Sequence, residues 1–260
     1  MRALIFVNGE YAAAPEAAEY YIALAAAADL VIAADGGAGQ ALMLGVTPDL
    51  LIGDFDSLAP EELDKASAAG AEIERHPVHK DQTDTELAVA AAEARGCDEI
   101  VLVGALGGEP DHLLGNLSVL RGLAQRDRTA RAVAIDVVVR ALCAPAKLVL
   151  ACAPGTRVSL SVLTERASVT LSGFDYEVTH GSLCANSCVG LGNAVAQPPA
   201  TITLHKGELL VFVFDHAEAR GVHDTGSSQP EAGLGDAAEQ PVDDHDSRGD
   251  PDGPYDEDVI

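Results

Sequence analysis

The sequence of 260 residues contains no tryptophan and few positive charges. It has 16 lysine and arginine residues against 41 aspartate and glutamate residues, which gives a formal net charge of −25 at pH 7. Proteins that bind nucleic acids by neutralising phosphates need a basic surface. The charge balance therefore excludes a protein of that class.

Long apolar runs are also missing. No run approaches the roughly 18 apolar residues of a membrane-spanning helix, and the first apolar run meets Gly9 and Glu10 too soon for a signal peptide. We therefore expect a cytoplasmic protein that does not associate with membranes. The five cysteines are odd in number and show no CxxC spacing, so neither a disulfide framework nor a zinc site is expected.

The apolar fraction of 48% and the mean hydropathy of +0.13 are sufficient for one or two packed cores. The composition changes at His216, because residues 216–260 contain 13 acidic and 2 basic residues and almost no β-branched or aromatic ones. Such a segment cannot bury enough surface to offset the entropy lost on ordering. It is predicted to be a disordered acidic tail.

Residues 1–140 alternate short apolar runs, such as LVIAA and EIVLVG, with helical segments. This pattern predicts an α/β domain with a Rossmann-like parallel sheet and helices on both faces. From residue 141, short β-branched runs are separated by glycine and proline turns. Residues 141–215 are therefore expected to form a smaller antiparallel β-sandwich domain.

Polar turns follow the second and third apolar runs. Asp35, Gly36 and Gly37 come after LVIAA, where glycines let the backbone approach a ligand, although an ordinary strand-to-helix turn explains them equally well. Asp54 and Asp56 come after LLIG. In extended backbone, carboxylates two residues apart lie on one side and can share a divalent cation. The alternative is a solvated acidic turn.

A third polar segment precedes the helix expected from Thr83. Thr83 and Glu86 fit a capping box, and Asp84 complements the helix dipole, so these residues have a purely structural interpretation. Lys80 and Asp81 are not explained in this way. They place a cation and a further carboxylate beside a helix N-terminus, which is a favourable position for phosphate.

A fourth turn follows EIVLVG and contains Gly107 and Gly108 before a helix that carries Asp111, His112 and Asn116. A glycine-rich turn at a helix N-terminus can bind phosphate, although Asp111 also suits a simple helix cap. Neither GxGxxG nor GxxxxGK[ST] is present. Four such turns after four successive strands indicate a metal–nucleotide site along one sheet edge.

In combination, the motifs DGGA, GVTPDLLIGDFDS, KDQTDTELAV and GALGGEPDHLLGN resemble the thiamine pyrophosphokinase family over residues 1–215. This resemblance implies an α/β catalytic domain, a β domain that forms a homodimer, and thiamine bound between the subunits. It also implies transfer of a diphosphate group from ATP to thiamine with Mg²⁺ as cofactor.

The resemblance assigns roles to individual residues. It places Asp54, Asp56 and Asp84 as magnesium ligands, with Lys80, Asp81 and Asp111 completing the catalytic set. The expected ATP-binding residues are Asp35, Gly36, Gly37, Ser57, Thr83, Gly107, Gly108, His112 and Asn116. Tyr176 takes the position of a family tryptophan that covers thiamine, and Asn193 matches a second substrate-binding residue.

Two departures from the family pattern leave alternatives open. Glu109 stands where the family usually has arginine, and VGLGN replaces a segment that is usually rich in serine. A glutamate would repel phosphate where an arginine would bind it. A diphosphotransferase for another heterocyclic alcohol, such as a pterin, and a non-catalytic nucleotide- or thiamine-binding protein are therefore the alternative interpretations.

Overall fold

The computed structural model describes residues 1–55, 58, 60–77 and 81–214, without the side chain of Glu62. Asp56, Ser57, Lys80 and the expected acidic tail lie outside the described residues. The helices are α1 (Pro15–Ala26), α2 (Gly37–Met43), α3 (Pro60–Ala68), α4 (Asp84–Ala94) and α5 (Pro110–Gln125). The strands are β1 (Arg2–Phe6), β2 (Leu30–Ala34), β3 (Leu50–Gly53), β4 (Glu72–Arg75), β5 (Glu99–Val103), β6 (Thr129–Ala134), β7 (Val137–Cys143), β8 (Ala146–Leu150), β9 (Arg157–Val162), β10 (Arg166–Ser172), β11 (Val178–Cys184), β12 (Asn193–Ala194), β13 (Ala200–Lys206) and β14 (Glu208–Phe214).

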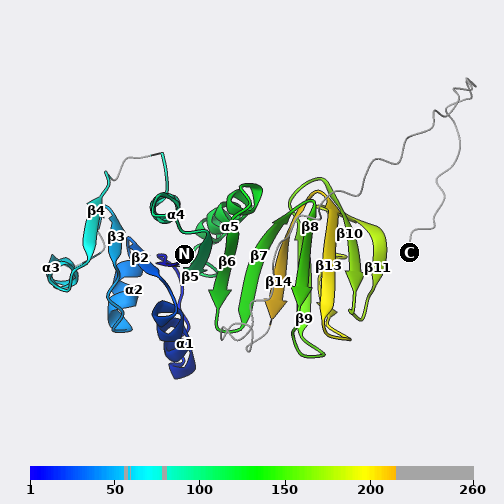
Figure 1. Cartoon of the computed structure of the whole chain (residues 1–260), viewed down its shortest axis with the longest axis horizontal. Coiled ribbons are helices and arrows are strands. Elements are labelled where there is room, and N and C mark those ends of the chain that lie inside the picture. Colours follow the sequence, from blue (N-terminus) through cyan, green and yellow to red (C-terminus); the bar gives the residue numbers. More distant parts are fainter. Residues whose placement is uncertain (56–57, 59, 78–80, 215–260) are drawn as a thin grey trace, which may run out of the picture. The chain divides into compact units, whose positions relative to one another are not determined.

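The strands form two sheets (Figure 1). One has ten strands in the order β12-β9-β14-β7-β6-β5-β1-β2-β3-β4, and the other has four in the order β11-β10-β13-β8. The six strands from β4 to β6 are parallel, while all the pairings from β6 to β12 are antiparallel. The expected fold class, a parallel α/β sheet followed by antiparallel β structure, is confirmed.

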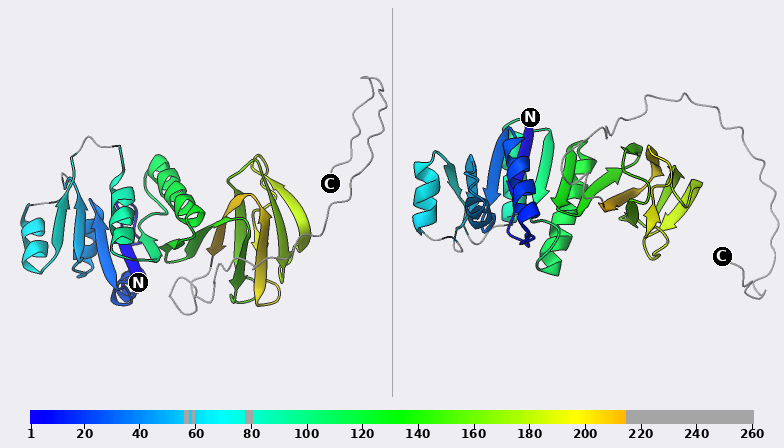
Figure 2. Two further views of the ribbon diagram at one scale, coloured as in Figure 1. Left: turned by 45° about the horizontal axis from the view of Figure 1, so that its top comes forward. Right: turned by 90° about the horizontal axis from the view of Figure 1, so that it is seen from below.

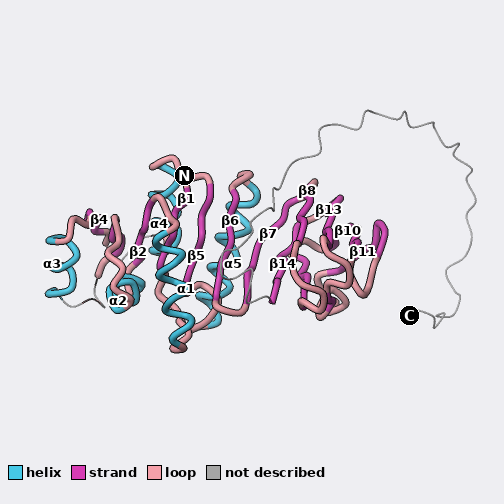
Figure 3. The backbone as a smooth tube through the Cα atoms, turned by 60° about the horizontal axis from the view of Figure 1, so that its bottom comes forward, coloured by secondary structure: helices cyan, strands magenta, loops and turns pink. Residues whose placement is uncertain are grey.

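Helices cover both faces of the parallel section, as Figures 2 and 3 show. The buried strand β1 explains this arrangement, because Leu4 and Phe6 pack on one side with residues of α1, α2 and α3. Ala3 and Ile5 point the opposite way and pack with residues of α4 and α5. No helix in the described part of the chain is long and apolar enough to cross a membrane.

A third core lies between the antiparallel strands of the two sheets. It contains Leu160 and Val211 from the large sheet and Val169 and Ile202 from the small one. The alternation of buried and partly exposed residues along β13, Ala200–Lys206, is typical of a strand with one face in such a core. The strands β6, β7, β11 and β12 were not predicted from the sequence, although β7 begins with the β-branched run Val137–Val139.

Strand order reverses at β1, which determines where a pocket can form. β2, β3 and β4 follow on one side of β1, whereas β5 and β6 lie on the other. Ligands of open α/β sheets bind beyond the carboxyl ends of the strands at such a reversal. Loops that follow neighbouring strands diverge at such a reversal. This divergence leaves space above the sheet.

The side chain of Tyr11 joins the carboxyl ends of β1 and β5. Its hydroxyl donates to the carbonyl oxygens of Val7 at 2.9 Å and Val103 at 3.1 Å. Burial raises the pKa of Tyr11 far above its ordinary value, so the hydroxyl keeps its proton. Gly104 is required beneath the ring, since a Cβ there would lie 2.5 Å from it and the residue has φ +77°.

We expect Tyr11→Phe to lower the free energy of unfolding by about 1–2 kcal/mol, because buried carbonyl groups lose a donor while the ring is retained. Urea titration followed by circular dichroism measures this difference. Tyr176→Phe is the matched control, because the Tyr176 side chain is exposed, and it should leave the midpoint unchanged. Equal stability of Tyr11→Phe and the unsubstituted protein would show that the Tyr11 hydroxyl does not stabilise the junction between β1 and β5.

Candidate functional site

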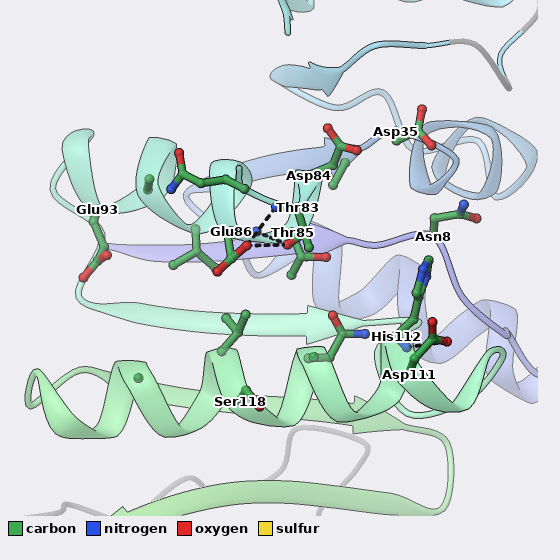
Figure 4. A pocket seen from close by; sticks show the side chains of 18 of the residues that line it. Asn8, Asp35, Thr83, Asp84, Thr85, Glu86, Glu93, Asp111, His112 and Ser118 are labelled. Carbon is green, nitrogen blue, oxygen red and sulfur yellow. Dashed lines mark hydrogen bonds between the residues drawn. The ribbon is translucent and has the colours of Figure 1, made fainter. Parts of the chain in front are cut away.

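A pocket of about 800 Å³ lies beyond the carboxyl ends of β2 and β3 and continues between α4 and α5 (Figure 4). Successive turns of each helix contribute to its walls, including Glu86, Val89 and Glu93 from α4. The lining residues are Asn8, Ala34, Asp35, Asp54, Gln82, Thr83, Asp84, Thr85, Glu86, Val89, Ala90, Glu93, Asp111, His112, Gly115, Asn116, Ser118, Val119, Gly122 and Arg126.

The pocket brings together many of the residues that the sequence singled out. Those that line it are Asp35, Asp54, Thr83, Asp84, Asp111, His112 and Asn116. Asp81, Gly36, Gly37, Gly107 and Gly108 do not line it, nor do Tyr176 and Asn193, which belong to the antiparallel part. Asp56, Ser57 and Lys80 lie outside the described residues, so their predicted roles stay predictions.

Helix α4 begins in the capping box that the sequence predicted. The Glu86 backbone N–H donates to Thr83 Oγ1 at 3.2 Å, and the Thr83 backbone N–H donates to Glu86 Oε2 at 2.8 Å. This reciprocal pair satisfies backbone donors that the first helical turn would otherwise leave unpaired. It also fixes the position of Asp84, the first residue of the helix, at the edge of the pocket.

The pocket is strongly acidic. Six carboxylates line it, from Asp35, Asp54, Asp84, Glu86, Glu93 and Asp111. Glu86 caps α4, and Glu93 bonds Arg126 and Arg128, each at 3.2 Å. Arg126 is the one lysine or arginine among the lining residues within the described chain.

The remaining carboxylates come from separate elements. Asp35 follows β2, Asp54 follows β3 and Asp84 begins α4; Asp35 and Asp84 are labelled in Figure 4. Negative charges gathered in one pocket repel each other, and a bound cation relieves that repulsion. Carboxylate oxygens are the ligands that hard divalent cations prefer. These three side chains are therefore of the chemical type that binds such a cation, while the acidic and histidine side chains of the described chain whose ligand atoms lie within 4.8 Å of one another are Glu109, Asp111 and His112.

At the start of α5, the structure separates Glu109 from the pocket. Glu109 is the N-cap residue of the helix and has no side-chain capping bond, while its carboxylate lies 3.6 Å from His112 Nε2. Asp111 lies inside the first turn, where its carboxylate accepts the N–H of His112 at 3.0 Å. Glu109 is not among the lining residues. Glu109, which stands where the family usually has arginine, thus places its negative charge beside His112.

Sequence reasoning missed Asn8, Gln82, Thr85, Glu93 and Arg126, which also line the pocket. Asn8 had a recognisable signal, because it follows a buried strand as the other site residues do. Gly36 lies close beside it, since a Cβ there would lie 2.5 Å from Asn8 Oδ1 and would displace that side chain. No signal in the sequence pointed to Glu93 and Arg126. These two residues meet only because α4 and α5 pack on the same face of the sheet.

Tyr176 and Asn193, the two expected substrate-binding residues, do meet. The Asn193 side chain accepts the Tyr176 backbone N–H at 3.1 Å and donates to the Tyr176 carbonyl at 2.9 Å. Both amide functions of Asn193 thus hold the loop that carries Tyr176. The tyrosine side chain itself is 76% exposed.

The fold and pocket define a class of protein: a doubly wound α/β protein with an acidic ligand pocket at the reversal point of its sheet. Residues 21–132 match the family "Thiamin pyrophosphokinase, catalytic domain". That stretch contains Asp35, Asp54, Asp84 and Asp111. This stretch of the chain is similar to the catalytic domain of the thiamine pyrophosphokinase family.

Two curated relatives are similar in sequence. The thiamine pyrophosphokinase of Bacillus subtilis (strain 168) is 36% identical over 35% of this chain and 42% of its own length. Thiamine pyrophosphokinase 1 of Oryza sativa subsp. japonica is 33% identical over 36% of this chain and 43% of its own length. Each alignment thus spans less than half of the relative.

Solved structures extend the likeness to the whole fold. The thiamine pyrophosphokinase structure from Bacillus subtilis superposes with a TM-score of 0.70 at 23% identity, covering 83% of this chain and 99% of that one. The structure from Geobacillus thermodenitrificans gives a TM-score of 0.68 at 25% identity, covering 83% and 98%. The antiparallel part is therefore included in the shared architecture.

Thr83→Ala should destabilise the protein by about 1 kcal/mol, because it removes the side chain that caps α4. Thr85→Ala lies two residues away, inside the helix, and should be neutral or slightly stabilising because alanine has the higher helix propensity. Thermal unfolding of the two variants measures the contrast. Equal melting temperatures would show that the cap contributes nothing to stability.

Proposed function

We propose that this protein transfers the diphosphate group of ATP to the hydroxyl group of thiamine, forming thiamine diphosphate and AMP. The observation that carries the proposal is that the stretch matching the family's catalytic domain, residues 21–132, contains Asp35, Asp54, Asp84 and Asp111, which converge on one pocket. The proposed setting is the cytoplasm.

In this reaction a bond forms between the thiamine hydroxyl oxygen and the β-phosphorus of ATP. The bond from the β-phosphorus to the bridging oxygen of the α-phosphate breaks, AMP leaves, and the hydroxyl proton passes to water or a carboxylate. Transfers of this kind have loose transition states and depend mainly on positioning and on neutralising charge. The protein must therefore hold an anionic nucleotide and a cationic alcohol in line within an acidic pocket.

Asp54 and Asp84 are the described residues that would hold Mg²⁺, together with Asp56 from the family resemblance. When bound, the ion would neutralise phosphate charge and stabilise the leaving group. Asp35 and Asn8 would orient the polyphosphate from the neighbouring strand ends. Lys80, with Asp81 beside it, would add the positive charge that the resemblance assigns to this segment.

The long part of the pocket suits the nucleoside of ATP. Val89, Ala90, Gly115, Val119 and Gly122 give it small and apolar walls between α4 and α5. Ligand pockets typically combine such walls with a few polar groups that fix orientation. The Gly107–Gly108 turn precedes α5 and does not line the pocket, and the family resemblance assigns its N–H groups to phosphate.

Thiamine would be covered by the ring of Tyr176, whose face attracts a cationic heterocycle by about 0.5–2 kcal/mol. Tyr176 does not line the pocket, so this role needs a second subunit to bring the ring to the site. We therefore include a homodimer in the proposal.

The direct test is to incubate the full chain with ATP, thiamine and magnesium and to quantify the products by chromatography. AMP formed one-for-one with thiamine diphosphate is the expected result. ADP with thiamine monophosphate would overturn the diphosphate transfer. Turnover with a pterin alcohol but not with thiamine would favour the alternative acceptor, and ATP binding without any product would favour a binding protein.

Asp84→Asn should lower kcat by at least about a hundredfold, the scale of losing one preorganised electrostatic group. Asp64→Asn is the matched control, because Asp64 is exposed on α3 and does not line the pocket. Steady-state product formation gives both rates, and circular dichroism checks that both variants fold. A rate for Asp84→Asn close to that of the control would remove Asp84 from the site.

A further inference from the structure

Two residues at the pocket have unusual backbone conformations. Asp35 has φ +43° and Phe55 has φ +60°, and among the described non-glycine residues only Asp127 and His180 share a positive φ. Aspartate tolerates the left-handed region, but a bulky aromatic residue there is a genuine outlier. Such strain persists only where the surrounding structure enforces it, and it often occurs at functional sites.

The two strained turns pack directly against each other. The N–H of Asp35 donates to the carbonyl of Ile52 at 2.9 Å. Gly53 has φ +149°, and a Cβ on it would lie 3.2 Å from the N, Cα and Cβ atoms of Asp35. The turn after β3 therefore cannot shift without disturbing the turn after β2.

The buried side chain of Phe55 holds the residues after β3 in place. Its ring is only 5% exposed and belongs to the core that also contains Leu51, Leu58 and Leu63. The Arg75 guanidinium carbon lies 5.4 Å from the ring centroid, within the range of a cation–π contact. Phe55 itself does not line the pocket.

Asp54 lies between the core-facing ring and the tightly packed Gly53. Phe55 is held in the core with a left-handed backbone, while the preceding residue, Asp54, lines the pocket. The orientation of a metal-binding carboxylate is best defined when the neighbouring residue in the chain is fixed by packing.

We propose that Phe55 is a positioning residue, whose buried ring holds the left-handed turn that presents Asp54 to a divalent cation beside Asp35. This inference rests on the proposed function for the identity of the cation site. The affinity of the site for the cation would then depend on a side chain that contacts neither the cation nor the substrate.

The test measures Mn²⁺ binding directly, by the loss of the free Mn²⁺ electron paramagnetic resonance signal, with the full chain and no ATP. Phe55→Ala should weaken binding by about tenfold or more, the scale seen when support of a metal ligand is removed. Phe55→Leu refills the core and should restore most of the affinity. Asp84→Asn tests whether the measured ion occupies this pocket.

Leu63→Ala is the matched control, because Leu63 is buried in the same core but lies on α3. It should lower the melting temperature as Phe55→Ala does and leave Mn²⁺ affinity unchanged. Unchanged affinity in Phe55→Ala, or an equal loss in Leu63→Ala, would overturn the positioning role, as would an unsubstituted chain that binds no Mn²⁺. Mn²⁺ binding that depends on Phe55 in a protein that makes no thiamine diphosphate would instead refute only the proposed function.

Discussion

The arrangement of the site depends on the pairing of β1 with β2 on one side and β5 on the other. All three strands run in the same direction, so their carboxyl ends meet at one edge, and the reversal of strand order opens space there. The Tyr11 hydroxyl bridges the ends of β1 and β5. A Cβ on Gly9 would lie 1.9 Å from the carbonyl oxygen of Gly104, so the turns that leave these two strands are in close contact. This local packing fixes the direction in which Asn8 and the start of α5 leave the sheet.

The charge of the pocket follows from how its acidic residues are used. Glu86 and Glu93 are held by hydrogen bonds to a helix cap and to arginines, so their charge is partly compensated within the fold. Asp35, Asp54 and Asp84 lie where the chain turns at element ends. A polyphosphate would be repelled by this set in the absence of cations. Under the proposed function, ATP would therefore enter the pocket together with a metal ion.

The sequence predicted the parallel section well because its strands are buried on both faces and read as continuous apolar runs. The helix cap at Thr83 and the gathering of Asp35, Asp54, Asp84 and Asp111 were predictable for the same reason, since each follows or precedes a recognisable element. β6 was missed because TARAVA contains three alanines and a single β-branched apolar residue, and β11 because most of its residues are not buried. Glu93 and Arg126 are 33 residues apart in sequence. No local sequence pattern predicts a contact between residues so far apart. The left-handed conformation of Phe55 was equally hidden, because its cause is tertiary packing and not residue preference.

Asn193, which the family resemblance assigns to substrate binding, holds a loop in the described chain. Its side-chain oxygen accepts the N–H groups of Tyr176 and Ala194, and its amide nitrogen donates to the Tyr176 carbonyl. Little hydrogen-bonding capacity is left for a substrate, because these bonds fix the loop that carries Tyr176. The ring that this loop carries is exposed, as are Val189 and Leu191 in a neighbouring segment. An aromatic side chain held on an ordered loop loses little entropy when it is covered, which favours its use as a contact for a flat cationic ring or for another subunit. Under the proposed function, the same fixed loop would serve both contacts.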